Sequence, residues 1–179
     1  MKATGIVRRV DDLGRIVIPK EIRRTLKIRE GDPLEIYTDG DGEVIFKKYS
    51  PIGELADTAV QYADAMIKHT SFPVVICDRD HCVAAAGISK REVLERRISP
   101  SLEEIMEARS QYIFSPNDKP KFPLEGIDRK ATVIMPIISA GDITGAVVLL
   151  MNETDSVATE TDIKLAQVAA AFLGKQMEE

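Results

Sequence analysis

The first fifty residues combine short β-branched runs with tight turns in a stretch that is too small to bury a core of its own. A helix is predicted over 20–27, where Ile22 and Leu26 fall on one face. The turns 11–14 and 39–42 separate the strands, which are predicted at 6–10, 15–19, 34–37 and 44–46. A segment of roughly 50 residues with open strand edges buries little surface alone. We therefore predict that it exists only as an interleaved dimer.

Charge is divided unevenly along the chain. The whole sequence has a formal net charge of −5, which by itself argues against a nucleic-acid partner. Residues 1–29 hold nine lysines and arginines against the three acids Asp11, Asp12 and Glu21, a balance of +6 that leaves −11 for the rest. A basic head on an acidic body predicts that the head meets a polyanion. The alternative is a solvated basic face with no such partner.

Residues 51–179 have the pattern of a larger domain that mixes helices and strands. Ser50 and Pro51 favour a helix N-cap and first turn, and this helix is predicted to run to about His69. Three further helices are predicted to begin at the capping pairs Ser89–Glu92, Ser101–Glu104 and Thr159–Asp162. Strands are predicted at 72–77, 82–85, 112–114, 131–138 and 143–151. This order predicts an α+β fold with an antiparallel sheet and flanking helices.

The run from Lys2 to Arg24 carries a family resemblance. It contains the string D-x-x-G-R-I-x-I-P-x-x-I-R, and it resembles the swapped-hairpin DNA-binding domain of the AbrB transition-state regulators over residues 1 to about 50. The second half resembles a GAF-type ligand-sensing domain in its order of elements. The resemblance thus implies two domains: a swapped-hairpin β-barrel for dimerisation and DNA binding at 1–50, and a GAF-like sensor and oligomerisation domain at 51–179.

The same resemblance implies partners, a location and a set of DNA contacts. The two halves together are similar to late-sporulation regulators of endospore-forming bacteria, which implies a cytoplasmic, nucleoid-associated protein of the forespore that activates some genes and represses others. It also implies a homodimer through the hairpins, a homotetramer through the C-terminal domains, and double-stranded DNA as partner. The implied DNA-binding residues are Arg8, Arg9, Arg15, Arg23 and Arg24, with Lys2, Lys20 and Lys47 as helpers.

The residue types support duplex DNA independently. A guanidinium presents a planar fork to phosphate oxygens or to a guanine edge, and a two-fold dimer repeats the cluster. No aromatic platform accompanies the basic residues, which disfavours stacking on single-stranded bases. Without a long recognition helix or a zinc-finger spacing, specificity is expected to come from DNA shape. The alternative for Arg15 and Arg23 is pairing with Asp11, Asp12 or Glu21.

Other chemistry has little support in the sequence. Hydrolase, zincin, P-loop and dinucleotide motifs are missing, so we expect neither an enzyme nor a cofactor. A thiol, imidazole and carboxylate cluster at 77–82 suggests a metal site, but its C-x4-C spacing is not usual for zinc and favours buried cysteines instead. No apolar run is long enough to cross a membrane.

The role of the acidic body stays open between two alternatives. A pocket between the sheet and the proline-containing loop 115–128 would bind a small molecule, with the loop as a lid. A domain of this kind also serves purely for oligomerisation. A second function class for the whole chain is an antitoxin-like protein-binding module, because related hairpin folds neutralise toxins. Against it, such antitoxins carry a disordered C-terminal segment, whereas this chain continues into a patterned domain.

Overall fold

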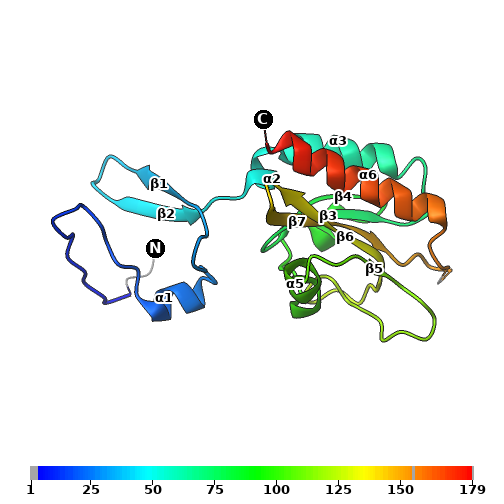
Figure 1. Ribbon diagram of the computed structural model, residues 1–179, viewed down its shortest axis with the longest axis horizontal. Helices are drawn as coiled ribbons and strands as arrows, with labels where there is room; N and C mark the ends of the chain where they lie inside the picture. The colour runs from blue at the N-terminus through cyan, green and yellow to red at the C-terminus, as the bar shows by residue number, and fades with distance from the viewer. Residues whose placement is uncertain (1–3, 155, 179) are drawn as a thin grey trace. The chain divides into compact units, whose positions relative to one another are not determined.

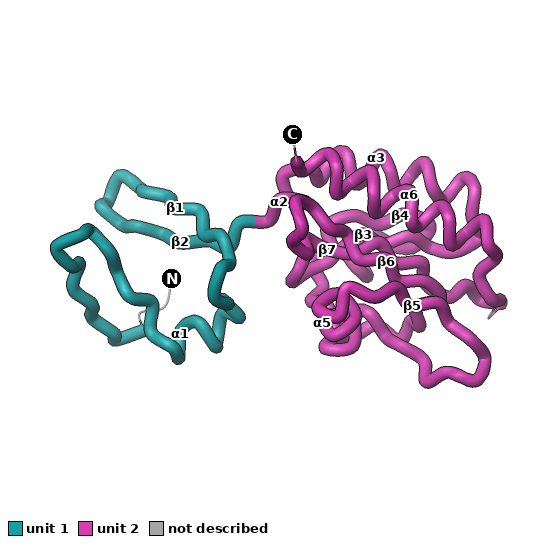
Figure 2. The backbone as a smooth tube through the Cα atoms, viewed as in Figure 1, with its two compact units in different colours: residues 1–49 teal, residues 50–179 magenta. Residues whose placement is uncertain are grey.

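The computed structural model describes residues 4–154 and 156–178, and the chain divides into two compact units, Met1–Tyr49 and Ser50–Glu179 (Figure 2). Unit 1 (Met1–Tyr49) contains helix α1 (Lys20–Thr25) and an antiparallel pair, β1 (Leu34–Thr38) and β2 (Val44–Lys48). These three elements lie within one or two residues of their predicted positions. The helix ends before its predicted limit because Lys27 adopts a positive φ of 52°.

The strands predicted at 6–10 and 15–19 are absent from this single chain, so that prediction is wrong for one copy alone. Backbone hydrogen bonds instead close a turn here, in which the Asp11 N–H donates to the Arg15 carbonyl at 3.0 Å and the Gly14 N–H to the Asp11 carbonyl at 3.0 Å. A strand requires a neighbouring strand to satisfy its backbone groups. Within residues 4–49, β1 and β2 pair only with each other.

Unit 1 also lacks a core. Pro19 is the only buried residue among residues 4–49, and the exposed fractions reach 85% for Val7 and 72% for Val17. Leu26, on the apolar face of α1, is 55% exposed. In one copy, unit 1 thus leaves most of its large apolar side chains exposed.

Unit 2 (Ser50–Glu179) is a five-stranded antiparallel sheet with helices on both faces (Figure 1). The strand order is β4 (Cys82–Ala86), β3 (Val74–Asp78), β7 (Asp142–Leu150), β6 (Ala131–Ser139) and β5 (Tyr112–Ile113). One face packs against α2 (Pro51–Glu54), α3 (Ala56–Met66) and α6 (Glu160–Gln176). The other face packs against α4 (Lys90–Val93) and α5 (Pro100–Glu107). The predicted α+β architecture with an antiparallel sheet is confirmed.

The alternation of side chains along the strands explains the two layers. Along β3, Val74 and Ile76 belong to the cluster under α3 and α6, whereas Val75 and Cys77 belong to the cluster under α4 and α5. All four side chains are fully buried, as expected for a strand covered on both faces. Small residues let α6 approach the sheet closely, since a Cβ at Gly174 would overlap the carbonyl oxygen of Ile138 on β6.

The predicted helix starts are correct at some positions and wrong at others. The Thr159–Asp162 capping box is formed in full, and the Ser50 hydroxyl caps α2 by accepting a bond from the Gly53 N–H at 3.1 Å. The single helix predicted to His69 is instead two, because Leu55 (φ −91°, ψ 20°) interrupts it.

The helix predicted to start at Ser101 starts earlier. Its N-cap is Ser99, whose hydroxyl accepts from the Leu102 N–H at 3.2 Å, and Pro100 takes the first helical position. The Ser101 hydroxyl donates to the Phe122 carbonyl at 3.1 Å instead. The Ser89 side chain forms no cap bond to α4, so the box expected there is also wrong.

Candidate nucleic-acid interface

Helix α1 presents three of the candidate DNA-binding residues. Its apolar side is formed by Ile22, which is half-buried, and Leu26, one turn later. Arg23 and Arg24 follow Ile22 at successive 100° steps around the helix, so their side chains leave on other faces, and both are exposed. Lys20 is exposed at the first turn. Among residues 4–154 and 156–178, none of these three cations has an ion-pair or hydrogen-bond partner for its side chain.

Two more candidate DNA-binding residues lie in the extended segment before the turn at residues 11–14. Arg8 and Arg9 are both exposed, and their guanidinium groups make no ion pair within the part of the chain that the structure describes. Because no local acid neutralises them, both charges are available to an external anion. Lys2 was also predicted as a DNA contact, and it lies outside the described residues.

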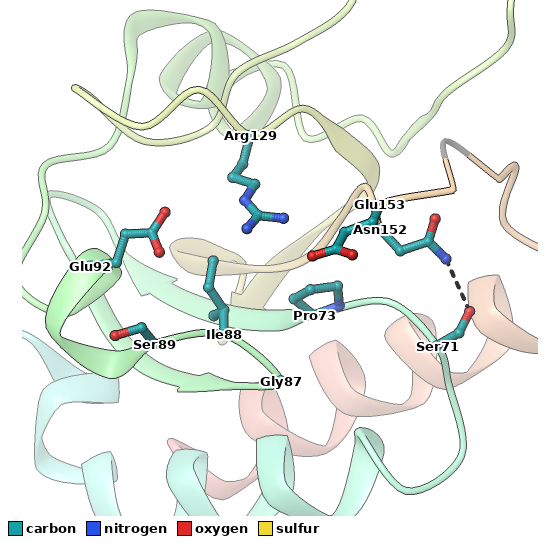
Figure 3. Close-up of a pocket in the computed structure, with 9 residues that line it drawn as sticks. All are labelled: Ser71, Pro73, Gly87, Ile88, Ser89, Glu92, Arg129, Asn152 and Glu153. Carbon is teal, nitrogen blue, oxygen red and sulfur yellow. Dashed lines mark hydrogen bonds between the residues drawn. The ribbon is translucent and has the colours of Figure 1, made fainter.

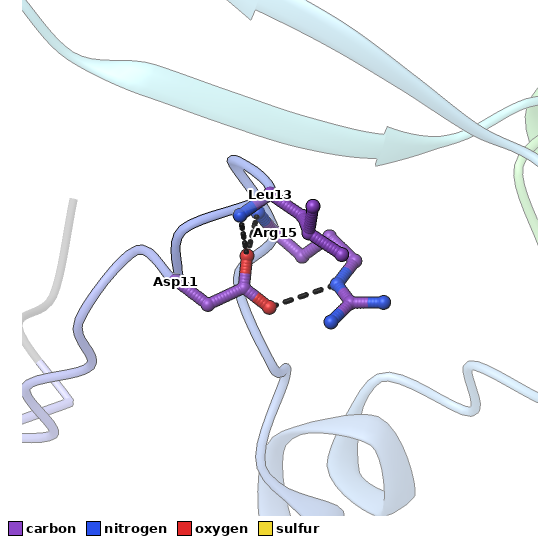
Figure 4. A network of polar contacts seen from close by, with 3 residues as sticks. All are labelled: Asp11, Leu13 and Arg15. Atoms are coloured by element: carbon purple, nitrogen blue, oxygen red, sulfur yellow. Dashed lines mark hydrogen bonds and ion pairs between the residues drawn. The ribbon is translucent and has the colours of Figure 1, made fainter.

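Arg15 is held in place by Asp11 (Figure 4). One carboxylate oxygen of Asp11 accepts the N–H groups of Leu13 at 3.0 Å and of Arg15 at 2.8 Å, and the other accepts Nε of Arg15 at 2.8 Å. Gly14 completes the turn with φ 76°, a conformation that favours glycine. The Arg15 backbone N–H, followed by its guanidinium, holds the pKa of Asp11 below its ordinary value.

This ion pair is the alternative that the sequence left open for Arg15, and the structure contains it. The pair uses only Nε, so both Nη groups of Arg15 have no hydrogen-bond partner among the described residues. The side chain stays 68% exposed. Asp11 therefore orients the guanidinium and leaves its outer edge free to meet an anion. For Arg23 the structure shows no such pair in the described part of the chain.

Lys47 lies on a different element from the other candidates. It is exposed on β2, and its Nζ lies 4.6 Å from the centre of the Tyr37 ring on β1, in cation–π range. The next lysine, Lys48, is instead close to Asp32, with 4.0 Å between Nζ and the carboxylate. The cations of unit 1 thus divide into exposed ones and at least one that belongs to a local charge cluster.

The two cysteines of unit 2 lie in its hydrophobic core. Cys77 and Cys82 are opposite each other across β3 and β4, and both thiols are free and fully buried. A hydrogen bond with Cys82 and burial both raise the pKa of Cys77 well above its ordinary value. Asp78 accepts bonds from the Ser50 hydroxyl at 2.9 Å and from the backbone of Asp80 and His81. Among the described residues no three metal-ligating side chains are grouped to hold an ion.

The sequence also predicted a pocket in unit 2 with residues 115–128 as its lid. A pocket of about 440 Å³ lies at one end of the sheet of unit 2 (Figure 3), and residues 115–128 do not line it. Sequence reasoning missed this pocket because its lining comes from separate segments of the chain. No helix within the described ranges combines the length and apolar character that a bilayer crossing needs.

Comparison with known proteins divides the chain four residues after the boundary between the two units. Residues 54–178 match the family model of the stage V sporulation protein T C-terminal transcription factor, and residues 7–53 match that of the MazE bacterial antitoxin, an antidote that recognises a toxin. Stage V sporulation protein T of Bacillus subtilis is 52% identical over 181 residues, which span all of both chains. The transition state regulatory protein AbrB of Bacillus subtilis is 55% identical over 69 residues, 35% of this chain and 71% of that protein.

A solved structure agrees with unit 2 in fold. The GAF domain of an Acinetobacter phosphoenolpyruvate-protein phosphotransferase superposes with a TM-score of 0.56 at 11% identity, over 73% of this chain and 84% of that one. At that identity the likeness concerns the fold alone. The AbrB-like first half and the GAF-like second half predicted from the sequence are both confirmed.

Proposed function

This chain belongs to the stage V sporulation protein T family of transcription factors, and on that premise we propose that it binds duplex DNA through unit 1 and regulates transcription during late sporulation. The observation that carries the proposal is the set of exposed arginines at 8, 9, 15, 23 and 24. Four of them have no ion-pair partner in the described part of the chain, and Arg15 is oriented by Asp11 with its outer edge free. With Lys2, Lys20 and Lys47, they form the proposed contact surface.

We propose that the binding unit is a dimer of interleaved hairpins. The support is the exposed apolar surface of unit 1 together with segments 6–10 and 15–19, which have strand composition and no strand neighbour in one copy. A second copy would supply the missing backbone partners and cover those side chains. Two-fold symmetry would also present every arginine twice, which suits the repeated phosphates of a duplex.

Pairs of dimers are proposed to join through unit 2. On α6, Val168 is 59% exposed and Phe172 is 40% exposed, and the Phe172 ring stacks on Tyr62 of α3 with 5.2 Å between ring centres. These residues make a partly apolar face over two adjacent helices. A second copy of the same face would complete a helical bundle, giving a homotetramer in which 1–50 binds DNA and 51–179 assembles the protein and senses a ligand.

The setting of this regulation is a further part of the proposal. The name of the full-length relative assigns that protein to stage V of sporulation. We propose that this chain likewise acts at the nucleoid of the forespore, activating some genes and repressing others. Transcript levels in a deletion strain test this, and changes of only one sign would contradict the dual role.

A second candidate function is an antitoxin-like module, which is favoured by the MazE match over residues 7–53. The two candidates differ in the part of the chain after the hairpins. Antitoxins of that kind hold their toxin with a C-terminal segment that folds on binding, whereas residues after 50 here form a packed sheet with two buried layers. This difference favours the regulator.

Fluorescence anisotropy of a labelled late-sporulation promoter duplex across a salt series tests the proposed function. If about eight phosphates are neutralised per dimer, log affinity falls with log salt at a slope of about −7. Removing Arg23 and Arg24 in both copies takes away up to four of those contacts, so the R23A/R24A variant is expected to give a slope of about −4 and weaker binding.

A matched control removes the same charge elsewhere. Lys90 and Arg91 are both exposed on α4 of unit 2, so a K90A/R91A variant is expected to keep the parent slope. Equal losses in both double variants would show that only the total charge matters and would contradict the assignment of the contact surface to unit 1. Unchanged binding by R23A/R24A would remove α1 from that surface.

A further inference from the structure

The pocket at one end of the sheet is formed by the ends of four adjacent strands. Ser71 and Pro73 precede β3, Gly87 and Ile88 follow β4, Arg129 precedes β6, and Asn152 and Glu153 follow β7, while Ser89 and Glu92 begin α4. The antiparallel register brings these ends together, since Val74 is opposite both Ala86 and Leu149, and Ala131 is opposite Leu150. The register of these four strands therefore determines where the pocket lies.

Backbone bonds and one glycine hold the walls of this pocket. The Leu150 N–H donates to the Pro73 carbonyl at 2.8 Å, and the Met151 N–H to the Lys130 carbonyl at 2.7 Å. Gly87 has a φ of 75°, and a Cβ there would lie 3.3 Å from Cα of Pro73 and overlap the Ile67 side chain. A side chain at position 87 would clash with Ile67, so glycine allows the turn after β4 to pack closely beside Pro73.

Three charged side chains face the opening without neutralising one another. Figure 3 shows the Arg129 guanidinium between the carboxylates of Glu92 and Glu153, above Ile88 and Pro73. Among the residues that the structure describes, none of the three side chains makes an ion pair or a hydrogen bond. Arg129 and Glu92 are half-buried. The pocket thus holds charges of both signs that have no protein partner. Such a pocket suits a ligand that carries an anionic group for the arginine and cationic groups for the glutamates.

Asn152 lines the edge of the pocket, and its side chain is hydrogen-bonded within the protein, unlike the three charged side chains. Its Nδ2 donates to the Ser71 hydroxyl at 3.3 Å, and its Oδ1 accepts from the hydroxyls of Thr154 at 2.8 Å and Ser156 at 3.0 Å. The Ser156 backbone N–H also donates to Oδ1 at 3.3 Å. With its side-chain groups engaged, Asn152 fixes the segment that carries Glu153. The pocket thus has an ordered wall and three free charges.

From this arrangement we infer that the pocket binds a free amino acid with a second ammonium group, of which L-lysine is the simplest probe. Its carboxylate would meet Arg129, and its two ammonium groups would meet Glu92 and Glu153. Two carboxylates and one guanidinium leave the cavity one negative charge in excess, which such a diamino acid, with a net charge of +1, balances. A pocket of about 440 Å³ holds a molecule of this size, and Ile88 and Pro73 offer apolar contact to its methylene chain.

The inference rests on the proposed sensing role of unit 2, but its test does not involve DNA. Isothermal titration of the full chain with L-lysine is compared with 1,5-diaminopentane, which lacks the carboxylate, and with L-norleucine, which lacks the second ammonium. Losing a charge-assisted contact is expected to weaken binding by at least about tenfold for each analogue. The R129Q variant is expected to lose the preference for lysine over 1,5-diaminopentane.

Two controls keep the inference falsifiable. Arg91→Gln changes an exposed arginine on α4 that does not line the pocket, and it is expected to bind lysine like the parent. Circular dichroism checks that Arg129→Gln is folded, and E92Q gives a second variant with its own expected loss. The inference is overturned if lysine does not bind, if an analogue binds as tightly, or if R129Q and R91Q behave alike. A chain that binds lysine but no duplex would refute the proposed regulator and leave this site standing.

Discussion

Replacing Leu26 with aspartate tests whether a second copy covers unit 1. In a single copy this side chain is 55% exposed. Full burial of a leucine is worth about 1.5–3 kcal/mol, so covering the exposed 55% contributes about 0.8–1.7 kcal/mol per copy and about 1.7–3.3 kcal/mol per symmetric dimer. That sum corresponds to a roughly 15- to 250-fold weaker dimer, and an aspartate in an apolar contact adds to the loss.

A neighbouring residue provides the matched control. Thr25 is exposed and its side chain is polar, so Thr25→Asp introduces the same charge without removing an apolar side chain. If Leu26 were solvent-exposed in solution, both variants would stay within about 0.5 kcal/mol of the parent, as surface changes do. The comparison therefore separates a covered surface from an exposed one.

Sedimentation velocity of the full chain over a range of concentrations measures the difference. The parent and T25D are expected to sediment as tetramers, whereas L26D loses the contact in unit 1 and keeps the contact in unit 2, so it is expected to sediment as a dimer. Circular dichroism confirms that unit 2 stays folded. An L26D protein with the parent's assembly state at every concentration would refute the argument that unit 1 is completed by a second copy.

Three further predictions concern unit 2. Helix propensity alone favours Gly174→Ala by about 1 kcal/mol. A Cβ there overlaps the Ile138 carbonyl and forces α6 away from β6, so we expect the variant to unfold at a lower urea concentration than the parent. A higher urea midpoint would refute the close approach of α6 to β6. Burial raises the pKa of Asp162, but hydrogen bonds from Thr159 and Thr70 outweigh it and hold the pKa below its ordinary value. The ionised Asp162 carboxylate therefore contributes fully to the free energy of unfolding above about pH 4, and this contribution is lost as pH falls through the lowered pKa. The difference in free energy of unfolding between the parent and Asp162→Asn is expected to narrow below about pH 4 in urea titrations. A difference that stays constant with pH would contradict this. Ser99→Ala removes the α5 cap and is expected to cost about 1 kcal/mol in the same assay; no change would assign the cap elsewhere.

Features that depend on a few neighbouring residues could be predicted from the sequence. The Thr159–Asp162 capping box forms within one helical turn, and all of its donors and acceptors are local. The 39–42 turn likewise depends on Asp39, whose carboxylate accepts the N–H groups of Asp41 and Glu43, and on Gly42 at a φ of 81°. Local chemistry of this kind is independent of what the rest of the chain does, so the sequence pattern is sufficient.

Features that depend on distant residues could not be predicted. The serine that caps α5 was misplaced by two positions, because Ser101 has a competing partner in the Phe122 carbonyl, far away in the sequence. The segments at 6–10 and 15–19 have strand composition but need a neighbouring strand that one copy does not provide. The charged pocket was missed for a related reason: Glu92, Arg129 and Glu153 become neighbours only through the register of four strands.

Strand β3 runs from the proposed ligand pocket to the residue at which unit 2 begins. At its last residue, Asp78 accepts a bond from the hydroxyl of Ser50, the first residue of unit 2 and the N-cap of α2. At its other end, Val74 follows Pro73, which lines the charged pocket. Because β3 is almost fully buried and bonded on both edges, it resists bending. A ligand that moved Pro73 would therefore act on a strand whose far end is hydrogen-bonded to Ser50, the residue where the chain arrives from unit 1.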